Sequence, residues 1–422
     1  MDDLDSRAGV GAGGERPIPG AAAAAPAASP GATVELATTG VAVGGDAVAR
    51  EPGGRVVFVR GALPEERVLA RITEARRRFA RGEVLEVLDP SPDRVPPPCP
   101  HVADGCGGCS WQHVTPEAQR RLKEGIVADT LRRVGHVEGV PVSSVALPDR
   151  GYRTSLRCLV VGGGLAFRRF HGHDAVPVRS CLVAHPLLDE LFREGRFDGA
   201  EEVELRAGAR TGERLVVAHP TATDLVLPPD VLTVGTDELE AGAAAWYHEE
   251  AGGRRWRVSA LSFFQVRPDG ADVLAGLVAG AAGDATTAVD LYSGVGLFAG
   301  VLAERELEVV AVEGRAGAAA DARHNLAGLP VNLVEGDVLA WSPTPADLVV
   351  ADPSRAGLGE RGVEVIAACD PRRVVVVACD PAALGRDAGL LVARGFGLSE
   401  VTVVDLFPHT PHVEAVAVFD RP

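Results

Sequence analysis

The sequence predicts an α/β protein in which a C-terminal doubly wound domain follows a small β-barrel and a central mixed α+β domain. From about residue 254 to the end, strand-like and helix-like segments alternate, which is typical of a mostly parallel, Rossmann-like sheet. Over residues 33–88, short alternating apolar segments are separated by Gly and Pro, which favours a small β-barrel. A cysteine cluster and a mixed, β-rich region lie between these two parts.

Composition and charge narrow the class of protein. The chain has 422 residues, 46% of them hydrophobic, which is enough to form several cores and excludes wholesale disorder. The net charge of −16 argues against a general nucleic-acid binder, although it leaves room for a local basic patch. No apolar run approaches the ~18 residues that a membrane span needs, and the start, MDDLDSRAGV, is acidic where a signal peptide would be basic. We therefore expect a soluble, cytoplasmic protein with no membrane partner.

Four segments follow from the pattern along the chain. Residues 1–32 are rich in Ala, Gly and Pro and are predicted to be a disordered low-complexity tail. Residues 33–90 form the predicted barrel, and the segment DPSPDRVPPP breaks regular structure after it. Residues 91–250 form the predicted central domain, including an amphipathic helix within WQHVTPEAQRRLKEGIVADTLRRVG. Residues 251–422 form the doubly wound domain.

A nucleotide-like cofactor site is predicted at the carboxyl ends of the C-terminal strands, where ligands bind in open α/β sheets. AVDLYSGVGLFAGVLA is a strand, a tight Gly-x-Gly turn and a helix, and Glu313 closes the next strand, where its carboxylate can accept both hydroxyls of a ribose. The third glycine of the dinucleotide fingerprint is missing and Asp337 follows the third strand, which favours S-adenosylmethionine over NAD. The alternative is that Glu313 is only a polar strand terminus.

Three further residues with candidate roles in binding or catalysis are predicted at the same edge. Asp352 ends the fourth strand, although an Asp in that position is also a common helix cap. Cys379 ends the next strand, just before a helix whose N-terminus can favour a thiolate, whereas Cys369 lies at the opposite end and is predicted to be structural. A buried core cysteine is the alternative for Cys379. The final strand must return antiparallel, which places Glu414 at this edge as a candidate base.

A thiolate, a methyl donor and a carboxylate at one edge fit a known type of reaction. The thiolate adds to C6 of a uracil, so that C5 becomes a carbon nucleophile and takes the methyl group. A base then removes the C5 proton, and the cysteine is expelled.

The chain resembles the class I RNA 5-methyluridine methyltransferase family, in the branch that carries a TRAM domain and an iron–sulfur cluster. The resemblance covers nearly everything from residue 33 onward, in the segments CPHVADGCGGCSWQH, YRTSLRC, FFQVRP, DLYSGVGLFA, DPSRAGL, ACDPAALGRD and FPHTPHVE. It implies that Cys379 is the nucleophile and Glu414 the base. It also implies that S-adenosylmethionine is contacted by Gln265, Tyr292, Glu313 and Asp352.

The cysteine cluster predicts a metal centre. Cys99, Cys106 and Cys109 have the spacing of ligands, and Cys181 in VRSCLVAHP is the candidate fourth ligand. Four thiolates suit either a [4Fe–4S] cluster or tetrahedral zinc, and spacing does not separate these two. The resemblance favours the iron–sulfur cluster, for which we expect a role in folding or RNA binding.

RNA is the expected partner. Arginines are concentrated between Arg67 and Arg81 of the predicted barrel, where they can bind RNA phosphates. The alternative is that these arginines, offset by neighbouring glutamates, form only a solvated charged face. The central domain offers aromatic and guanidinium contacts for an unpaired loop at Tyr152, Arg153, Arg157, Arg168 and Arg169.

The expected activity is S-adenosylmethionine-dependent methylation of uridine C5 in an unpaired RNA loop, with ribosomal RNA favoured and tRNA open. The alternatives are a methyltransferase with a non-RNA substrate and a non-catalytic RNA-binding protein with a decayed methyltransferase domain. The presence of Glu313, Asp352, Cys379 and Glu414 together argues against decay. No obligate protein partner is indicated.

Overall fold

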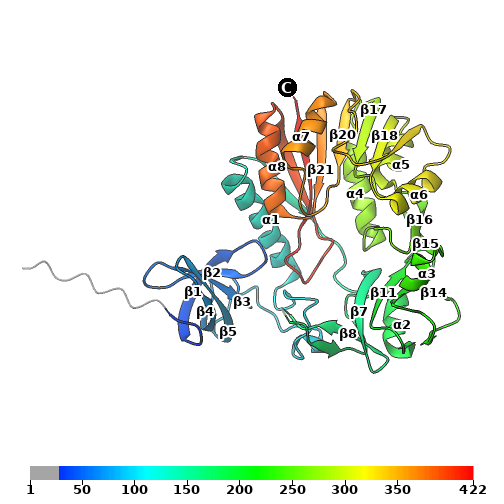
Figure 1. Cartoon of the computed structure of the whole chain (residues 1–422). Coiled ribbons are helices and arrows are strands. Elements are labelled where there is room, and N and C mark those ends of the chain that lie inside the picture. Colours follow the sequence, from blue (N-terminus) through cyan, green and yellow to red (C-terminus); the bar gives the residue numbers. More distant parts are fainter. Residues whose placement is uncertain (1–27, 171, 422) are drawn as a thin grey trace, which may run out of the picture.

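The computed structural model describes residues 28–170 and 172–421, which form a barrel, a central domain and a larger α/β domain (Figure 1). Except for residues 28–32, the predicted disordered tail lies outside the described residues. Within the described part, no helix combines the length and apolar character needed to cross a membrane.

The N-terminal strands close into a barrel, as the sequence predicts. They are β1 (Thr33–Val41), β2 (Ala47–Arg50), β3 (Val56–Arg60), β4 (Arg67–Ala75) and β5 (Phe79–Asp89), in the order β1-β2-β3-β5-β4. Alternate residues such as Val57 and Val59 point inward and are completely buried, because successive side chains of a strand lie on opposite faces. The barrel stands to one side of the other domains (Figure 1).

The central domain is built on a mixed six-stranded sheet. Its strand order is β14-β12-β11-β7-β8-β9, and α2 packs on it through the buried Leu188 and Leu191. The sheet strands are β7 (Ser155–Val161), β8 (Gly164–Arg168), β9 (Ala175–Pro177), β11 (Glu202–Ala207), β12 (Arg214–His219) and β14 (Val231–Gly235). The remaining elements are η1 (Pro100–Val102), α2 (Pro186–Glu194), β10 (Arg196–Phe197), β13 (Leu225–Val226), α3 (Thr236–Glu240) and the hairpin β15 (Trp246–Ala251) and β16 (Arg254–Ser259).

The C-terminal domain contains an eight-stranded sheet in the order β19-β18-β17-β20-β21-β23-β22-β6. All neighbours are parallel except that β23 runs antiparallel to both β21 and β22. The strands are β6 (Val142–Val145), β17 (Thr287–Leu291), β18 (Glu308–Glu313), β19 (Val331–Glu335), β20 (Leu348–Ala351), β21 (Arg373–Ala378), β22 (Gly397–Val404) and β23 (Glu414–Asp420). The predicted doubly wound α/β class is confirmed.

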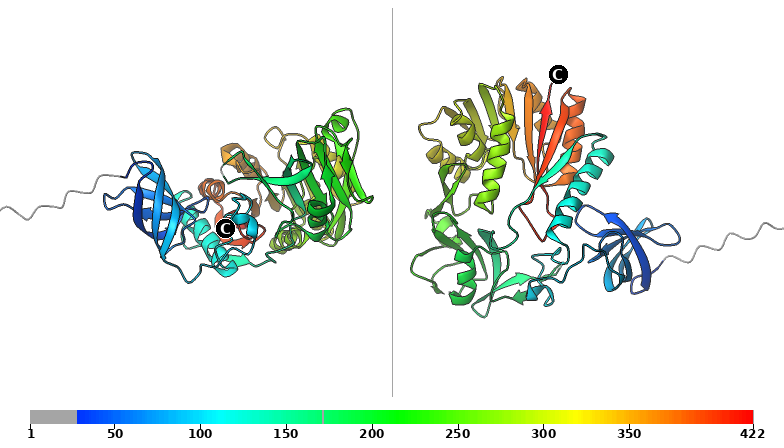
Figure 2. Two further views of the ribbon diagram at one scale, coloured as in Figure 1. Left: turned by 90° about the horizontal axis from the view of Figure 1, so that it is seen from below. Right: turned by 180° about the vertical axis from the view of Figure 1, so that it is seen from behind.

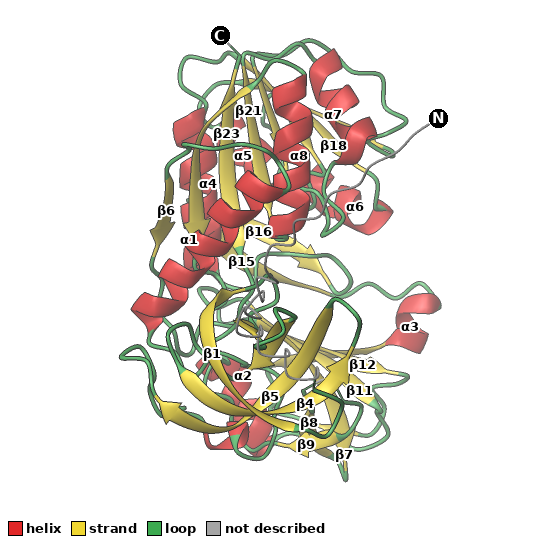
Figure 3. Cartoon of the chain, turned by 90° about the vertical axis from the view of Figure 1, so that its left-hand side faces the viewer, coloured by secondary structure: helices red, strands yellow, loops and turns green. Residues whose placement is uncertain are grey.

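Helices cover both faces of this sheet (Figures 2 and 3). One face packs against α4 (Pro268–Ala281), α5 (Leu297–Ala303) and α6 (Ala316–Asn325), and the other against α1 (Pro116–Arg133), α7 (Gly359–Ala368) and α8 (Pro381–Ala393). Burial on two faces explains why a central strand such as β21 reads as the apolar run VVVVA rather than as an alternating pattern.

Two elements that precede the central sheet in the chain belong to the C-terminal sheet by packing. β6 pairs in parallel with β22, and α1 packs against α8. A Cβ on Gly385 would lie 2.9 Å from the Thr130 carbonyl oxygen, so the glycine permits the close approach of these two helices. The segment between residues 116 and 145 therefore ties the cysteine-rich region to the C-terminal domain.

Candidate functional site

Five of the predicted site residues of the C-terminal domain lie at one edge of its sheet. Tyr292, Asp352 and Cys379 each follow a parallel strand directly, and Glu313 is the last residue of β18. Glu414 begins the antiparallel β23, whose Ala415 pairs with Ala378 at the end of β21. This edge is turned toward the central domain, and the connection between β22 and β23 extends from it (Figure 1).

The glycine turn after β17 is joined to Glu313. Tyr292, Gly294 and Gly296 all have positive φ, with Gly296 at +99°, where a side chain would be strained. The Gly294 N–H donates to Glu313 Oε2 at 2.8 Å, and the Arg315 N–H donates to Oε1 at 2.6 Å. A Cβ on Gly294 would meet nothing within 4 Å, so the turn faces open space beside a fixed carboxylate.

Two buried polar groups at this turn have unused hydrogen-bonding capacity, and we did not select either from the sequence. Asp290 Oδ2 accepts from the Ala299 N–H at 2.9 Å, but Asp290 Oδ1 and Ser293 Oγ have no hydrogen-bond partner among the described residues. Burial, with smaller contributions from Asp352 and Glu313, raises the pKa of Asp290 to about 8. A carboxyl in an otherwise apolar strand, AVDL, is the signal that would have found it. These groups, together with Glu313, suit a ligand rich in hydroxyl and amino groups.

The acidic groups at the edge influence one another. Burial raises the pKa of Asp352 to about 7, and burial together with Asp352 raises the pKa of Glu414 well above its usual range. The pKa of the Cys379 thiol is raised to about 11, first by burial and then by Glu414 and Asp352, while Arg355 opposes the shift. Like charges in a desolvated site disfavour one another's ionised forms, so the acidic groups at this edge are coupled in their titration. We did not identify Arg355 from the sequence.

The surroundings of the two C-terminal-domain cysteines, Cys379 and Cys369, differ. Cys379 is half-buried and lies immediately before α8, whose first turn is capped by Asp380 accepting from the Ala383 N–H at 2.8 Å. Cys369 is fully buried at the end of α7, and its Sγ contacts the Val365 carbonyl oxygen at 3.4 Å. Gln265 lies in the loop before α4 and is 7% exposed.

The connection that leads into Glu414 is held by α1 and by the cysteine-rich segment. Lys123 Nζ donates to Asp405 Oδ1 at 2.7 Å and to the Phe407 carbonyl oxygen at 2.9 Å. The His409 N–H donates to Gln119 Oε1 at 2.6 Å, and the His409 carbonyl accepts from the Trp111 N–H at 2.8 Å. The start of β23 is therefore fixed from outside the C-terminal strands.

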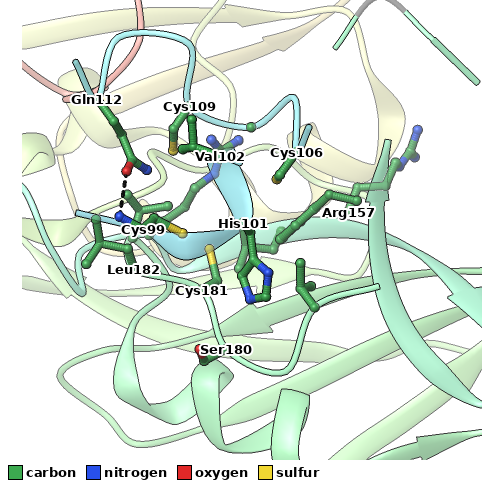
Figure 4. A pocket seen from close by; sticks show the side chains of 16 residues that line it. Cys99, His101, Val102, Cys106, Cys109, Gln112, Arg157, Ser180, Cys181 and Leu182 are labelled. Atoms are coloured by element: carbon green, nitrogen blue, oxygen red, sulfur yellow. Dashed lines mark hydrogen bonds between the residues drawn. The ribbon is translucent and has the colours of Figure 1, made fainter. Parts of the chain in front are cut away.

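The four predicted ligand cysteines gather around one cavity. Cys99, Cys106, Cys109 and Cys181 line a cavity of about 200 Å³, and their sulfur atoms are seen around it in Figure 4. Burial, with the other three cysteines adding to it, raises the pKa of Cys109 to about 12. Within residues 28–170 and 172–421, no three His, Cys, Asp or Glu side chains are arranged to hold a single metal ion. Cys158 lies instead in the core of the central domain.

Most of the barrel arginines are paired with carboxylates. Within the described chain, Arg77 and Arg78 form no ion pair. The local positive charge of the barrel is thus partly offset. The paired arginines are Arg67 with Glu35 and Asp89, Arg71 with Glu83, Arg76 with Glu74, and Arg81 with Asp46 and Glu74.

Comparison with known proteins agrees with this architecture. The TRAM domain family matches residues 28–85. An uncharacterized RNA methyltransferase of Streptomyces avermitilis is 39% identical over 420 residues, covering 90% of this chain and 96% of the relative. The 23S rRNA (uracil(1939)-C(5))-methyltransferase RlmD of Alkalilimnicola ehrlichii is 34% identical over 437 residues, covering 92% and 96%.

The fold is also similar to a solved structure, the Pyrococcus abyssi tRNA (uracil-54, C5)-methyltransferase in complex with S-adenosyl-L-homocysteine. The TM-score is 0.72 at 22% identity, with 92% of this chain and 100% of that chain covered. The barrel, the doubly wound sheet and these relatives define a class I RNA methyltransferase. The chain belongs to the RNA uracil-C5 methyltransferase family.

Proposed function

We propose that this protein methylates C5 of a uridine in RNA, with S-adenosylmethionine as the methyl donor. The observation that carries the proposal is that Cys379, Asp352 and Glu414 lie at one sheet edge, with Glu414 at the start of β23, which pairs with the strand that Cys379 follows. A nucleophile and a candidate base at the same edge are the groups that uracil C5 methylation requires.

Cys379 acts as the nucleophile. Its thiolate adds to C6 of the uracil, and the electron pair released into the ring makes C5 nucleophilic. Arg355 and the start of α8 favour the thiolate, whereas burial, Glu414 and Asp352 disfavour it. When bound, S-adenosylmethionine supplies the methyl group that C5 takes, and the residues that would hold it are Gln265, Tyr292, Glu313 and Asp352.

Glu414 acts as the base that completes the reaction. It removes the proton from C5, the C5–C6 double bond re-forms, and the bond between C6 and the Cys379 sulfur breaks. A carboxylate whose pKa is raised by burial and by Asp352 is a stronger base than an exposed glutamate. The hydrogen bonds that hold His409 and Asp405 keep Glu414 in place for this step.

The cysteine cavity is proposed to hold a [4Fe–4S] cluster. Four thiol groups surround one space, and four thiolates are the ligand set of such a cluster, although they also suit tetrahedral zinc. The bound cluster would hold the cysteine-rich segment to β9 and α2, which flank Cys181. Anaerobically purified protein is expected to show broad absorption near 400 nm and to contain on the order of four irons per chain. The Cys181→Ser variant is expected to lose both the absorption and the iron. Stoichiometric zinc without iron would contradict this.

The substrate is proposed to be ribosomal RNA. The support is the similarity over 92% of the chain to a relative named as a 23S rRNA methyltransferase. A target uridine must leave its stack to reach Cys379, so an unpaired loop costs less than a helix.

A methylation assay tests the reaction. The protein is incubated with labelled S-adenosylmethionine and total RNA from a strain lacking the gene, and the labelled nucleosides are identified. Label is expected in 5-methyluridine of the ribosomal fraction. Cys379→Ala is expected to abolish incorporation while donor binding, measured by equilibrium dialysis, is retained; the matched control Cys369→Ala, at the opposite end of the sheet, should stay active. Turnover by Cys379→Ala, or label in another nucleoside, would contradict the proposal. Label confined to tRNA would overturn only the choice of RNA.

A further inference from the structure

A second cavity lies directly beside the cysteine cavity. It has a volume of about 450 Å³ and shares Gly108, Arg157 and Phe167 with the cysteine cavity. The rest of its wall includes Arg168 at the end of β8 and the following Arg169 and Phe170, and none of its lining residues belongs to the Cys379 edge. Any ligand in this cavity is therefore separate from the reacting uridine.

The cysteine-rich segment builds part of this wall. The Gly107 N–H donates to the Arg168 carbonyl oxygen at 3.0 Å, and Cys106 forms a β-bridge with Arg169. A Cβ on Gly107 would lie 2.8 Å from the Phe170 nitrogen, so only glycine permits this contact. The conformation of the cysteine-rich segment and the shape of the second cavity are thus set together.

The cavity carries surplus positive charge. Arg157 and Arg168 have side chains 74% and 53% exposed, and both pair with a single acid, Glu202, at 3.1 and 3.5 Å. Arg169 adds a third positive charge to the same lining. On a chain with a net charge of −16, a cavity lined by three arginines and one carboxylate points to an anionic ligand.

Aromatic side chains accompany these arginines. Phe167 and Phe170 both line the cavity, and the guanidinium of Arg60 from the barrel lies 5.0 Å from the centre of the Phe170 ring. The barrel thereby reaches the rim of the cavity. Aromatic faces beside guanidinium groups are the chemistry that holds an unpaired nucleotide, with the base stacked and the phosphate bound.

We propose that this cavity is a subsite for one unpaired nucleotide of the substrate RNA, distinct from the target uridine. The base lies against Phe170, and Arg168 and Arg169 bind its phosphate. The proposal rests on the proposed function, because it assumes an RNA substrate. It also gives the cysteine-rich segment a defined task, which is to form the wall against which that nucleotide is held.

An RNA-binding assay tests the subsite. A fluorescent ribosomal RNA fragment that supports methylation is bound to the protein, and Kd is measured by anisotropy over a range of salt concentrations. The double variant Arg168→Ala with Arg169→Ala is expected to raise Kd at least about tenfold. It should also reduce the slope of log Kd against log salt concentration by the equivalent of about one to two phosphate contacts. Phe170→Leu is expected to raise Kd about fivefold or more with an unchanged salt slope, because it removes a stacking face but no charge.

Matched controls are Arg193→Ala and Arg196→Ala, which remove exposed, ion-paired arginines of the same domain outside the cavity. Both should leave Kd within about twofold. In the cavity variants KM for RNA should rise while kcat at saturating RNA stays near the wild-type value, since the Cys379 edge is untouched. Wild-type Kd in the cavity variants, or an equal loss in the controls, would overturn the subsite. Failure of the wild-type protein to methylate uridine would instead overturn the proposed function.

Discussion

The ion pair between Lys123 and Asp405 joins α1 to the connection that carries Glu414, and it is almost completely buried. The two side chains are 1% and 2% exposed, and Nζ lies 2.7 Å from Oδ1. Lys123→Met would leave the Asp405 carboxylate buried without its partner and would also remove the donor to the Phe407 carbonyl. Breaking a buried pair in this way costs about 3–5 kcal/mol. We expect a loss of that size in the free energy of unfolding.

Urea unfolding followed by tryptophan fluorescence measures this loss, and α1 itself provides the control. Arg133 pairs with Asp129 at 2.8 Å, but its side chain is 71% exposed. Arg133→Met should therefore cost at most about 0.5 kcal/mol. Combining Lys123→Met with Asp405→Asn removes both charges and should recover much of the loss. A loss below about 1 kcal/mol in Lys123→Met would refute the assignment of this pair as a clamp on the Glu414 connection.

Three further predictions concern the reacting edge. Glu414→Gln should accumulate a covalent protein–RNA adduct, seen on denaturing gels, because the C5 proton stays in place; absence of adduct would assign the base elsewhere. The pKa of the Cys379 thiol is about 11, and it is lowered by Arg355 and raised by Glu414. Arg355→Ala should therefore slow the labelling of Cys379 by iodoacetamide, and Glu414→Gln should speed it, as measured by mass spectrometry. Opposite signs would contradict this account. Gly296→Ala should weaken S-adenosylmethionine binding in dialysis and cost about 1–2 kcal/mol in urea unfolding, because φ is +99° and the new Cβ would lie 2.9 Å from Leu326.

The arrangement of the site was predictable where it follows from strand ends. Glu313, Asp352 and Cys379 close parallel strands, and parallel strands end at a common edge, so their meeting needed only the strand pattern. The position of Glu414 followed from one further step, the antiparallel return of β23. Local pattern and topology together were sufficient for these residues.

Contacts between distant segments could not be predicted in this way. The amphipathic pattern of α1 shows that one face is buried, but it does not tell which sheet covers that face, and α1 packs on the C-terminal sheet. Lys123 and Asp405 are 282 residues apart, and nothing in either local sequence marks them as partners. Arg355 acts on Cys379 through space, so its influence becomes visible only when the edge is assembled.

The raised pKa values at the edge lead to a last prediction, about protons released on donor binding. Asp352, with a pKa of about 7, is half protonated near neutral pH, and it is a proposed contact of S-adenosylmethionine. A sulfonium carries a positive charge that favours the carboxylate, so its binding should lower this pKa and release a fraction of a proton at pH 7. S-adenosylhomocysteine has the same groups without that charge and should release less. Calorimetry in buffers of different ionisation enthalpy measures the difference, which should shrink in Asp352→Asn. Equal proton release with both ligands would show that Asp352 does not face the sulfonium.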